Sequence, residues 1–336
     1  FISILRTPTS PWLPSEWVQT GVMSWLGEEP DPLPLYLLWS TAGAFLVIGA
    51  VIQRALYSIG FTKAQESGDR WVRQTIFAGA LHKLLTPLGL VRRELVMKEV
   101  RLFFRDTTQW SQLILLAVLV VVYIANIKFL PMKGEGVSFF VGNLIPFLNL
   151  VLSGFVLASI AARFIFPGVS LEGRTMWLLR SSPLPMRDLL WSKFWVGTIP
   201  LLFFALALVL ITGFLMKVSD FIMIVSVLTI TMMTFAIAGL AVGFGTLYPR
   251  FDTENAAQIP TSFGGLLFMM ASIVVIGAVI TLEARPVFSY LASRSFGSDR
   301  DPMEMIWGFG FAFLICAAAT ILPVRAARKR LEALEF

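Results

Sequence analysis

Charged residues are scarce in this chain. Asp, Glu, Lys and Arg make up 14% of its 336 residues, whereas hydrophobic residues make up 57%. A soluble domain of this size carries about 25% charged residues. The composition is therefore typical of a membrane protein with several spans. The basic residues flank apolar runs and form no separate basic domain, so the net charge of +6 does not indicate nucleic-acid binding.

Residues that carry catalysis or bind metals are also few. The sequence has one cysteine, Cys316, which excludes a disulfide within it. Its one histidine, His82, lies beside Lys83, and no Cys/His metal spacing, HExxH or GxSxG motif occurs. We therefore expect no metal site and no catalytic residues. The GxxxxGK[ST] stretch that cradles nucleotide phosphates is absent as well, so we expect no nucleotide on this chain.

What the sequence does contain is long apolar runs, and a helix needs about 20 such residues to cross a bilayer. None of the runs has Asp, Glu, Lys, Arg or His in its core. The alternating pattern of a membrane β-barrel is absent. We therefore predict an all-α polytopic membrane protein. The predicted spans cover residues 35–53, 111–130, 139–162, 194–216, 221–247, 261–282 and 305–323.

Basic residues gather after the first predicted span, before the second, between the third and fourth, and after the last. If the spans alternate in direction, all of these places lie on one side of the membrane. An excess of Lys and Arg marks the cytoplasmic side. We therefore expect residue 1 and the mixed-charge segment 283–304 outside and the C-terminus in the cytoplasm. The membrane expected is the bacterial inner (plasma) membrane.

Two amphipathic segments lie outside the predicted spans. Residues 11–26 contain three tryptophans, which favour a helix in the outer interface, with an ordinary loop as the alternative. Residues 91–110 place apolar residues on one side of a helix, which indicates an interfacial helix or a helix that caps the bundle. The residues concerned are Trp12, Trp17 and Trp25 in the first segment and Val91, Leu95, Leu102 and Phe103 in the second.

The segment between the third and fourth predicted spans is charged and aromatic. We predict a short helix over residues 170–180, with Ser170 as its N-cap and Glu172 in its first turn. Prolines end this helix, and a second one begins near Asp188 and enters the membrane. This elbow is long and amphipathic enough to dock into a groove on a soluble partner, although it can also be a mere connection.

This segment resembles the first cytoplasmic loop of ABC type-2 transporter permeases. The matching residues are Glu172-Gly173-Arg174, Leu178-Leu179, Ser182-Pro183-Leu184, Leu189 and Lys193. Residues 91–330 also match the layout of that family, in which an amphipathic elbow helix precedes six spans. The resemblance implies a six-span permease bundle in residues 91–336. A cytoplasmic linker, 61–90, and an extra span with its outer helix, 1–60, come before it.

In that family the loop carries a coupling helix that sits in a cleft of a cytoplasmic ATPase subunit. The resemblance therefore implies a main ATPase contact in this loop and a second, smaller contact in residues 246–260. The implied coupling residues are Glu172, Gly173, Arg174, Trp177, Arg180, Ser182 and Pro183, and the second contact contains Arg250, Asp252 and Asn255. ATP and Mg are expected on two copies of the ATPase and not on this chain.

The function implied is that of the membrane subunit of an ATP-driven exporter, which is not itself an enzyme. It would move an amphipathic or lipid-like substrate outward through the lipid membrane. Asn143 and Asn149 are the polar residues expected to line a substrate path, although most such residues simply bridge helices. Gly239, Gly243 and Gly245 favour close helix packing, with flexing as the alternative.

Two other functions fit parts of the same pattern. A non-transporting anchor or sensor subunit for a cytoplasmic partner would use the same docking elbow. An ion-coupled carrier would need an ionisable group within the membrane, which the predicted span cores lack.

Residues 1–60 and 283–330 share one order of elements: an outer segment, a span and basic residues. There is little residue identity, and chance similarity is the alternative explanation. From this layout we expect residues 1–60 to be the end of an earlier permease half. The second half would then be the N-terminal part of the same polypeptide or another copy of the chain.

Overall fold

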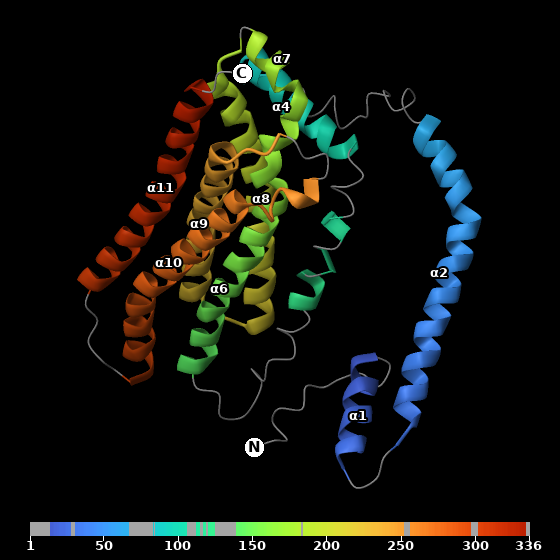
Figure 1. Ribbon diagram of the computed structural model, residues 1–336. Coiled ribbons are helices and arrows are strands. Elements are labelled where there is room, and N and C mark those ends of the chain that lie inside the picture. The colour runs from blue at the N-terminus through green and yellow to red at the C-terminus, as the bar shows by residue number, and fades with distance from the viewer. Residues whose placement is uncertain are drawn as a thin grey trace. The chain divides into compact units, whose positions relative to one another are not determined.

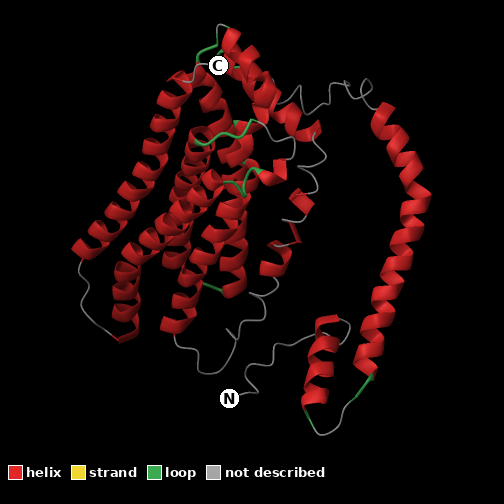
Figure 2. Cartoon of the chain, viewed as in Figure 1, coloured by secondary structure: helices red, strands yellow, loops and turns green. Residues whose placement is uncertain are grey.

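The computed structural model describes residues 14–27, 31–66, 83, 85–105, 112–114, 117–118, 120–124, 139–182, 184–251, 256–296 and 302–333. These residues are almost entirely helical, and they contain no strand (Figure 2). The α-helices are α1 (Pro14–Leu26), α2 (Leu33–Glu66), α4 (Leu90–Arg105), α6 (Phe139–Phe164), α7 (Met176–Ser181), α8 (Met186–Met216), α9 (Asp220–Leu247), α10 (Phe263–Phe296) and α11 (Pro302–Ala333). Short 3-10 helices are η2 (Phe166–Gly168), η3 (Ser170–Thr175) and η4 (Ala256–Gln258).

Six of the described helices are long and apolar enough to cross a membrane, which confirms the prediction of an all-α polytopic membrane protein. The second predicted span, 111–130, lies largely outside the described residues, and its described parts are helical. The six candidate spans are Leu33–Tyr57, Gly142–Gly173, Met186–Met216, Asp220–Leu247, Phe263–Ser295 and Met303–Ala333.

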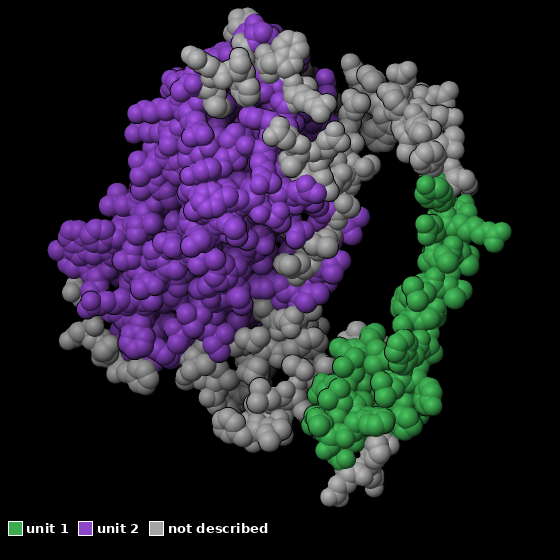
Figure 3. All heavy atoms as spheres, in the orientation of Figure 1, with its two compact units in different colours: residues 1–80 green, residues 81–336 purple. Residues whose placement is uncertain are grey.

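The chain divides into two compact units, Phe1–Ala80 and Leu81–Phe336 (Figure 3). In the first unit α1 packs against α2, and Gly21 of α1 is buried there. The helix predicted in residues 11–26 is present as α1, although Trp12 lies outside the described residues. The second unit contains all the other helices and holds the buried core.

Within the second unit, α9 packs against α6, α8, α10 and α11 (Figure 1). Close approach of α9 and α11 depends on glycine, because a Cβ at Gly239 would lie 2.6 Å from the Thr320 Cα atom. A Cβ at Gly243 would meet Pro323 of α11, and one at Gly245 would meet the carbonyl of Phe166. The predicted packing role of these glycines is confirmed.

Local signals explain where α8 begins and ends. It begins directly after Pro185, which has extended backbone, and Asp188 in its first turn favours the positive end of the helix dipole. It ends at Lys217, whose left-handed φ of 53° is a common C-cap conformation. The prediction of a helix start near Asp188 is confirmed, since α8 begins at Met186.

The sixth predicted span, 261–282, is part of a longer helix. We expected the span to stop at residue 282 and a mixed-charge outer segment to follow, but α10 continues to Phe296. Glu283 therefore lies inside the candidate span Phe263–Ser295 and is 0% exposed. Arg285, which is exposed, pairs with Glu304 of α11 at 2.9 Å. This candidate span is longer than the predicted core 261–282 and therefore contains an ionisable residue.

Candidate functional site

The first predicted contact loop folds as two short helices, η3 and α7, rather than as the single helix predicted over residues 170–180. The break is at Gly173, whose φ of 45° and ψ of −126° suit glycine. A Cβ at this position would lie 3.8 Å from the carbonyl oxygen of Phe251. The turn at Gly173 thus brings the first loop against the segment that follows α9.

Ser170 does not cap a helix as predicted, because no side chain caps η3. Its hydroxyl oxygen instead accepts a hydrogen bond from the backbone N–H of Arg250, at 3.1 Å. Ser170 lies at the start of the first predicted contact loop, and Arg250 lies in the second. The structure therefore brings these two loops together.

Glu172 is buried, and its side chain is 3% exposed. Lys98 of α4 donates hydrogen bonds to both carboxylate oxygens, at 2.8 and 2.6 Å. Lys193 of α8 donates to Oε1 at 2.5 Å. One carboxylate therefore joins three elements that lie far apart in the sequence: α4, η3 and the start of α8.

Glu99 of α4 completes a charge cluster, which we define as Lys98, Glu99, Glu172 and Lys193. The Lys193 ammonium lies 2.7 Å from Glu99 Oε1, and the Lys193 side chain is 7% exposed. Burial raises the pKa of Glu99 above its ordinary value, against the attraction of Lys193. Two lysines balance two glutamates, so the cluster is neutral when all four are ionised. Removing one member would leave an uncompensated buried charge, which costs about 3–5 kcal/mol.

A second ionic contact fastens α4 to the first turn of α8. The Arg92 guanidinium pairs with the Asp188 carboxylate at 2.8 Å and lies 5.1 Å from the centre of the Trp191 ring. Arginine over a tryptophan face contributes about 0.5–1 kcal/mol at a partly exposed position. Arg92 and the charge cluster together hold α4 on α8 at two places.

The predicted helix over residues 91–110 is present as α4, Leu90–Arg105. Of the apolar residues expected on one side of it, Leu95 is buried, whereas Val91 and Leu102 are 39% and 46% exposed. Val96 and Met97 are buried as well. The side of α4 that packs on α8 also carries Arg92 and Glu99, whose charges find partners there. A pattern that counts only apolar residues cannot reveal this.

The remaining predicted contact residues are placed only in part. Ser182 donates a hydrogen bond to the Leu179 carbonyl at 2.6 Å, at the end of α7. Leu171 and Leu178, on η3 and α7, are 42% and 57% exposed. Figure 1 shows α4 and α7 at the same end of the bundle. The side chains of Arg174, Trp177 and Arg180, and the whole of Pro183, Asp252 and Asn255, lie outside the described part of the chain.

The two asparagines of the predicted substrate path have different surroundings. Asn143 is 5% exposed and fixes the turn before α9, because its Oδ1 accepts a hydrogen bond from the Ser219 N–H at 2.9 Å. Its Nδ2 donates to the Phe139 carbonyl at 2.9 Å. Asn143 therefore bridges α6 and the turn before α9. Asn149 lies six residues further along α6, at a pocket.

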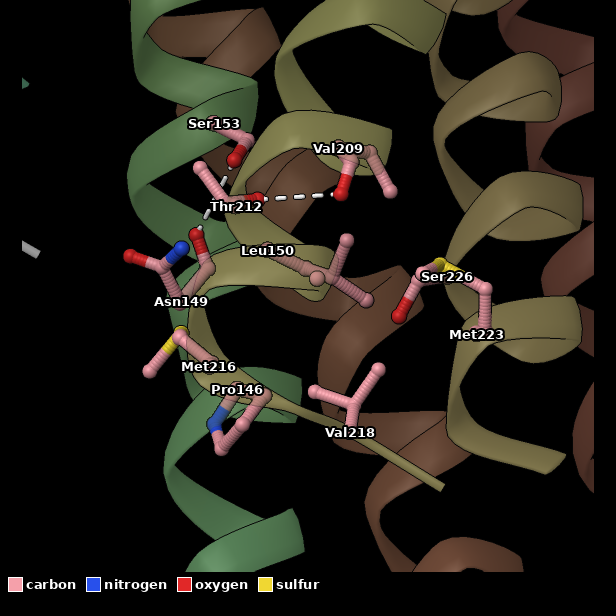
Figure 4. A pocket seen from close by; sticks show the side chains of 11 residues that line it. Pro146, Asn149, Leu150, Ser153, Val209, Thr212, Met216, Val218, Met223 and Ser226 are labelled. Atoms are coloured by element: carbon pink, nitrogen blue, oxygen red, sulfur yellow. Dashed lines mark hydrogen bonds between the residues drawn. The ribbon is translucent and has the colours of Figure 1, made fainter. Parts of the chain in front are cut away.

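Asn149 lines a pocket among α6, α8 and α9 (Figure 4). The cavity volume is about 10 Å³, which is room for about one water molecule. Hydroxyl groups of Ser153, Thr212 and Ser226 share the lining with apolar side chains. Ser153 also bonds to Tyr123, at 3.0 Å, in the second predicted span. The pocket thus offers both polar and apolar groups, but it does not include Asn143.

Glu283 is a candidate functional residue that the sequence reasoning missed. The Thr229 hydroxyl of α9 donates a hydrogen bond to Glu283 Oε2 at 2.6 Å. Glu283 Oε1 is buried and has no hydrogen-bond partner among the described residues. The predicted span ended one residue earlier, at 282. A search that tolerated one charged residue within an apolar run would have found it.

The described part of the chain contains no group of three His, Cys, Asp or Glu residues that could hold a metal ion.

Comparison with known families gives a match over the whole chain. The family model described as "Putative ATP-binding cassette" matches residues 1–336, the whole chain. No curated protein and no solved structure matches the chain. The family match agrees with the resemblance of residues 91–330 to ABC permeases. The chain therefore belongs to this ATP-binding cassette family, and its described helices are those of a multi-pass membrane protein.

Proposed function

We propose that this chain is the membrane subunit of an ATP-driven ABC transporter and that a separate cytoplasmic ATPase supplies the energy. The family assignment and the candidate spans support an ABC system in a membrane. The absence of a phosphate-binding GxxxxGK[ST] stretch from this sequence supports a separate site of ATP hydrolysis. ATP and Mg would then bind to the ATPase, in two copies.

The observation that carries this proposal is the burial of Glu172 between Lys98 and Lys193. A loop that only connected two spans would need no such contact. Here the loop is fixed to α8 through Glu172 and to the segment after α9 through Ser170. A force applied to the loop would therefore move the ends of α8 and α9 together. This is what a loop that passes on closure of an ATPase must do.

The docking surface we propose is the outer side of η3 and α7. Leu171 and Leu178 are exposed there, and an amphipathic helix with exposed leucines suits an apolar groove on a partner. Arg174 and Arg180 would pair with acidic residues of the ATPase, and Trp177 would anchor the helix. Arg250, Asp252 and Asn255 would form the second contact.

For the substrate we propose an amphipathic or lipid-like molecule that is moved outward. The hydroxyl groups and apolar side chains that line the small Asn149 pocket would lie along the path of such a molecule. A second permease half would complete the path. It would be either an N-terminal part of the same polypeptide or another copy of the chain. The membrane would be the bacterial inner membrane, with the C-terminus in the cytoplasm.

Copurification tests the proposal. The intact protein is isolated from gently solubilised membranes, and the eluate is assayed for ATP hydrolysis and for an ABC ATPase subunit by mass spectrometry. We expect the subunit with the wild-type protein and its loss with R174E/R180E. The control variant is R328E, which reverses an exposed charge on α11 that pairs with Glu332. Failure to find an ATPase under any nucleotide condition would contradict the proposal.

A further inference from the structure

Glu283 lies in α10, within the candidate span Phe263–Ser295, and plays no part in the proposed coupling. The residue is 0% exposed. Thr229 of α9 satisfies Oε2 with a hydrogen bond of 2.6 Å, whereas Oε1 has no partner among the described residues. A buried polar oxygen without a partner is rare in native structures and calls for an explanation.

The helices around Glu283 supply no counter-charge. Within α9 and α11, charged residues occur only toward the ends, and α6 has none within residues 139–162. Arg285, two residues along α10, is 81% exposed and pairs with Glu304. The one titratable side chain found to interact with Glu283 in the described structure is the buried thiol of Cys316 on α11.

Burial without a counter-charge disfavours an ionised carboxylate and favours a bound proton. The neutral acid is compatible with the contact to Thr229, because Oε2 can still accept that hydrogen bond while the proton is on Oε1. No cation among the described residues pairs with the Glu283 carboxyl group, since Arg285 pairs with Glu304.

α10 has a weak point next to this carboxyl. Pro286 has no N–H, so the carbonyl of Leu282 loses its helical hydrogen bond. Gly308 of α11 lies against this turn, since a Cβ there would be 2.7 Å from Pro286 Cγ and 2.9 Å from the Leu282 carbonyl oxygen. Pro286 is the one proline of α10, and Figure 1 shows that α10 changes direction along its length.

We propose that Glu283 is a proton-binding site inside the membrane domain and that α10 gives it access to water by bending at Pro286. In the conformation described here the Oε1–H bond is intact and the group is neutral. When α10 bends, the carboxyl meets water, the O–H bond breaks, the proton passes to water, and a carboxylate remains. The reverse movement takes a proton up again. The site binds its proton whether or not an ATPase is attached.

Chemical labelling tests proton binding. N,N′-dicyclohexylcarbodiimide, which partitions into membranes, adds the O–H of a carboxylic acid across its C=N bond and does not react with a carboxylate. The intact protein in native membranes is treated at pH 7, where an ordinary glutamate, with a pKa of about 4.3, is ionised. We expect modification of Glu283, detected by peptide mass spectrometry, and none of Glu332, whose side chain is 48% exposed.

E283Q serves as the blank, and the wild-type protein unfolded in detergent at acid pH shows that the peptide containing Glu283 can be detected when modified. An unmodified Glu283 in native membranes, with modification in the unfolded protein, would overturn the proposal.

The hydrogen bond from Thr229 gives a second test. This donor stabilises the carboxylate more than the neutral acid, so T229V should extend the labelling of Glu283 to higher pH, by about one pH unit. T229S keeps the hydroxyl and should behave as the wild type. Equal labelling curves for T229V and T229S would contradict the role given to this contact.

Bending at Pro286 is tested by water access. In a C316S background, E283C is treated with a water-soluble, membrane-impermeant thiol reagent, and the rate of modification is measured. P286A restores a donor for the Leu282 carbonyl and should slow the modification several-fold. An unchanged rate in P286A would overturn the bending step. None of these measurements needs transport or an ATPase, so their failure is distinct from failure of the proposed transporter function.

Discussion

At the scale of single residues, the carboxylate of Glu172 connects parts of the chain that are distant in sequence. Its partner Lys98 lies 74 residues away and its partner Lys193 lies 21 residues away. With Glu99, these residues form a neutral cluster that is largely shielded from water. The role that follows for Glu172 is internal: it fixes the loop, while the exposed residues of α7 are free to meet a partner.

Glu172→Gln should destabilise the protein. It leaves Lys193 buried with Glu99 as its remaining ionic partner, and the cost of breaking such a pair is about 3 kcal/mol. Thermal unfolding in detergent measures the effect, and ATP hydrolysis without transport is the expected functional result. The control E332Q removes an exposed pair with Arg328, which should change stability by less than about 1 kcal/mol. Equal effects of E172Q and E332Q would contradict the buried cluster.

Gly173→Ala should destabilise the turn between η3 and α7. The φ of 45° is unfavourable for a residue with a Cβ, by about 1–2 kcal/mol. Gly277→Ala is the matched control, because a Cβ at Gly277 meets nothing within 4 Å and alanine favours a helix. A lower melting temperature for G173A and an unchanged or higher one for G277A is the expected pair of results. No difference between the two variants would argue against the turn.

At the scale of elements, α4 is held to α8 by charge as well as by apolar packing. Arg92→Ala removes both the pair with Asp188 and the contact with Trp191, so α4 should detach from α8 more often. Limited proteolysis measures this as faster cleavage near α4. The control is R93A, because the salt bridge of Arg93 is a longer one, 3.3 Å, to its neighbour Glu94. Similar cleavage rates for R92A and R93A would be inconsistent with this anchoring.

The pairing of α9 with α11 rests on glycine. Gly239→Ala places a Cβ within 2.6 Å of the Thr320 Cα atom, so the helices must separate, at a cost of about 1–3 kcal/mol. Gly310→Ala of α11 is the control, since a Cβ there meets nothing within 4 Å. Thermal unfolding of the two variants in detergent checks this. A G239A protein as stable as G310A would show that the close approach is not needed.

The spans were predictable because an apolar run of about 20 residues is a strong and local signal. The partners of Glu172 were not, because a sequence pattern reports spacing within one segment and not pairs 74 residues apart. The burial of charged residues on α4 was not predicted for a related reason. From the sequence alone Arg92 and Glu99 are expected to face solvent, because their partners on α8 are not yet known. In the sequence, Glu283 and Pro286 indicate the end of a span. In the structure α10 continues past both, with Thr229 of α9 bonded to Glu283 and Gly308 of α11 beside Pro286.

At the scale of the whole molecule, the chain combines a unit of two described helices, α1 and α2, with a bundle that carries the proposed coupling loops. The chain belongs to an ATP-binding cassette family, and we propose that a separate ATPase supplies the energy. The central claim is therefore that an ABC ATPase binds at α7 and its neighbouring loop.

Photo-cross-linking from α7 tests this claim most directly. A photoreactive amino acid replaces Leu178, which is 57% exposed, and the intact protein is irradiated in its own membranes. The matched control carries the same group at Ile306, which is 66% exposed at the start of α11. We predict a cross-link from position 178 to an ABC ATPase subunit and none from position 306. A protein without that cross-link at 178, or with it equally at both positions, would contradict the account.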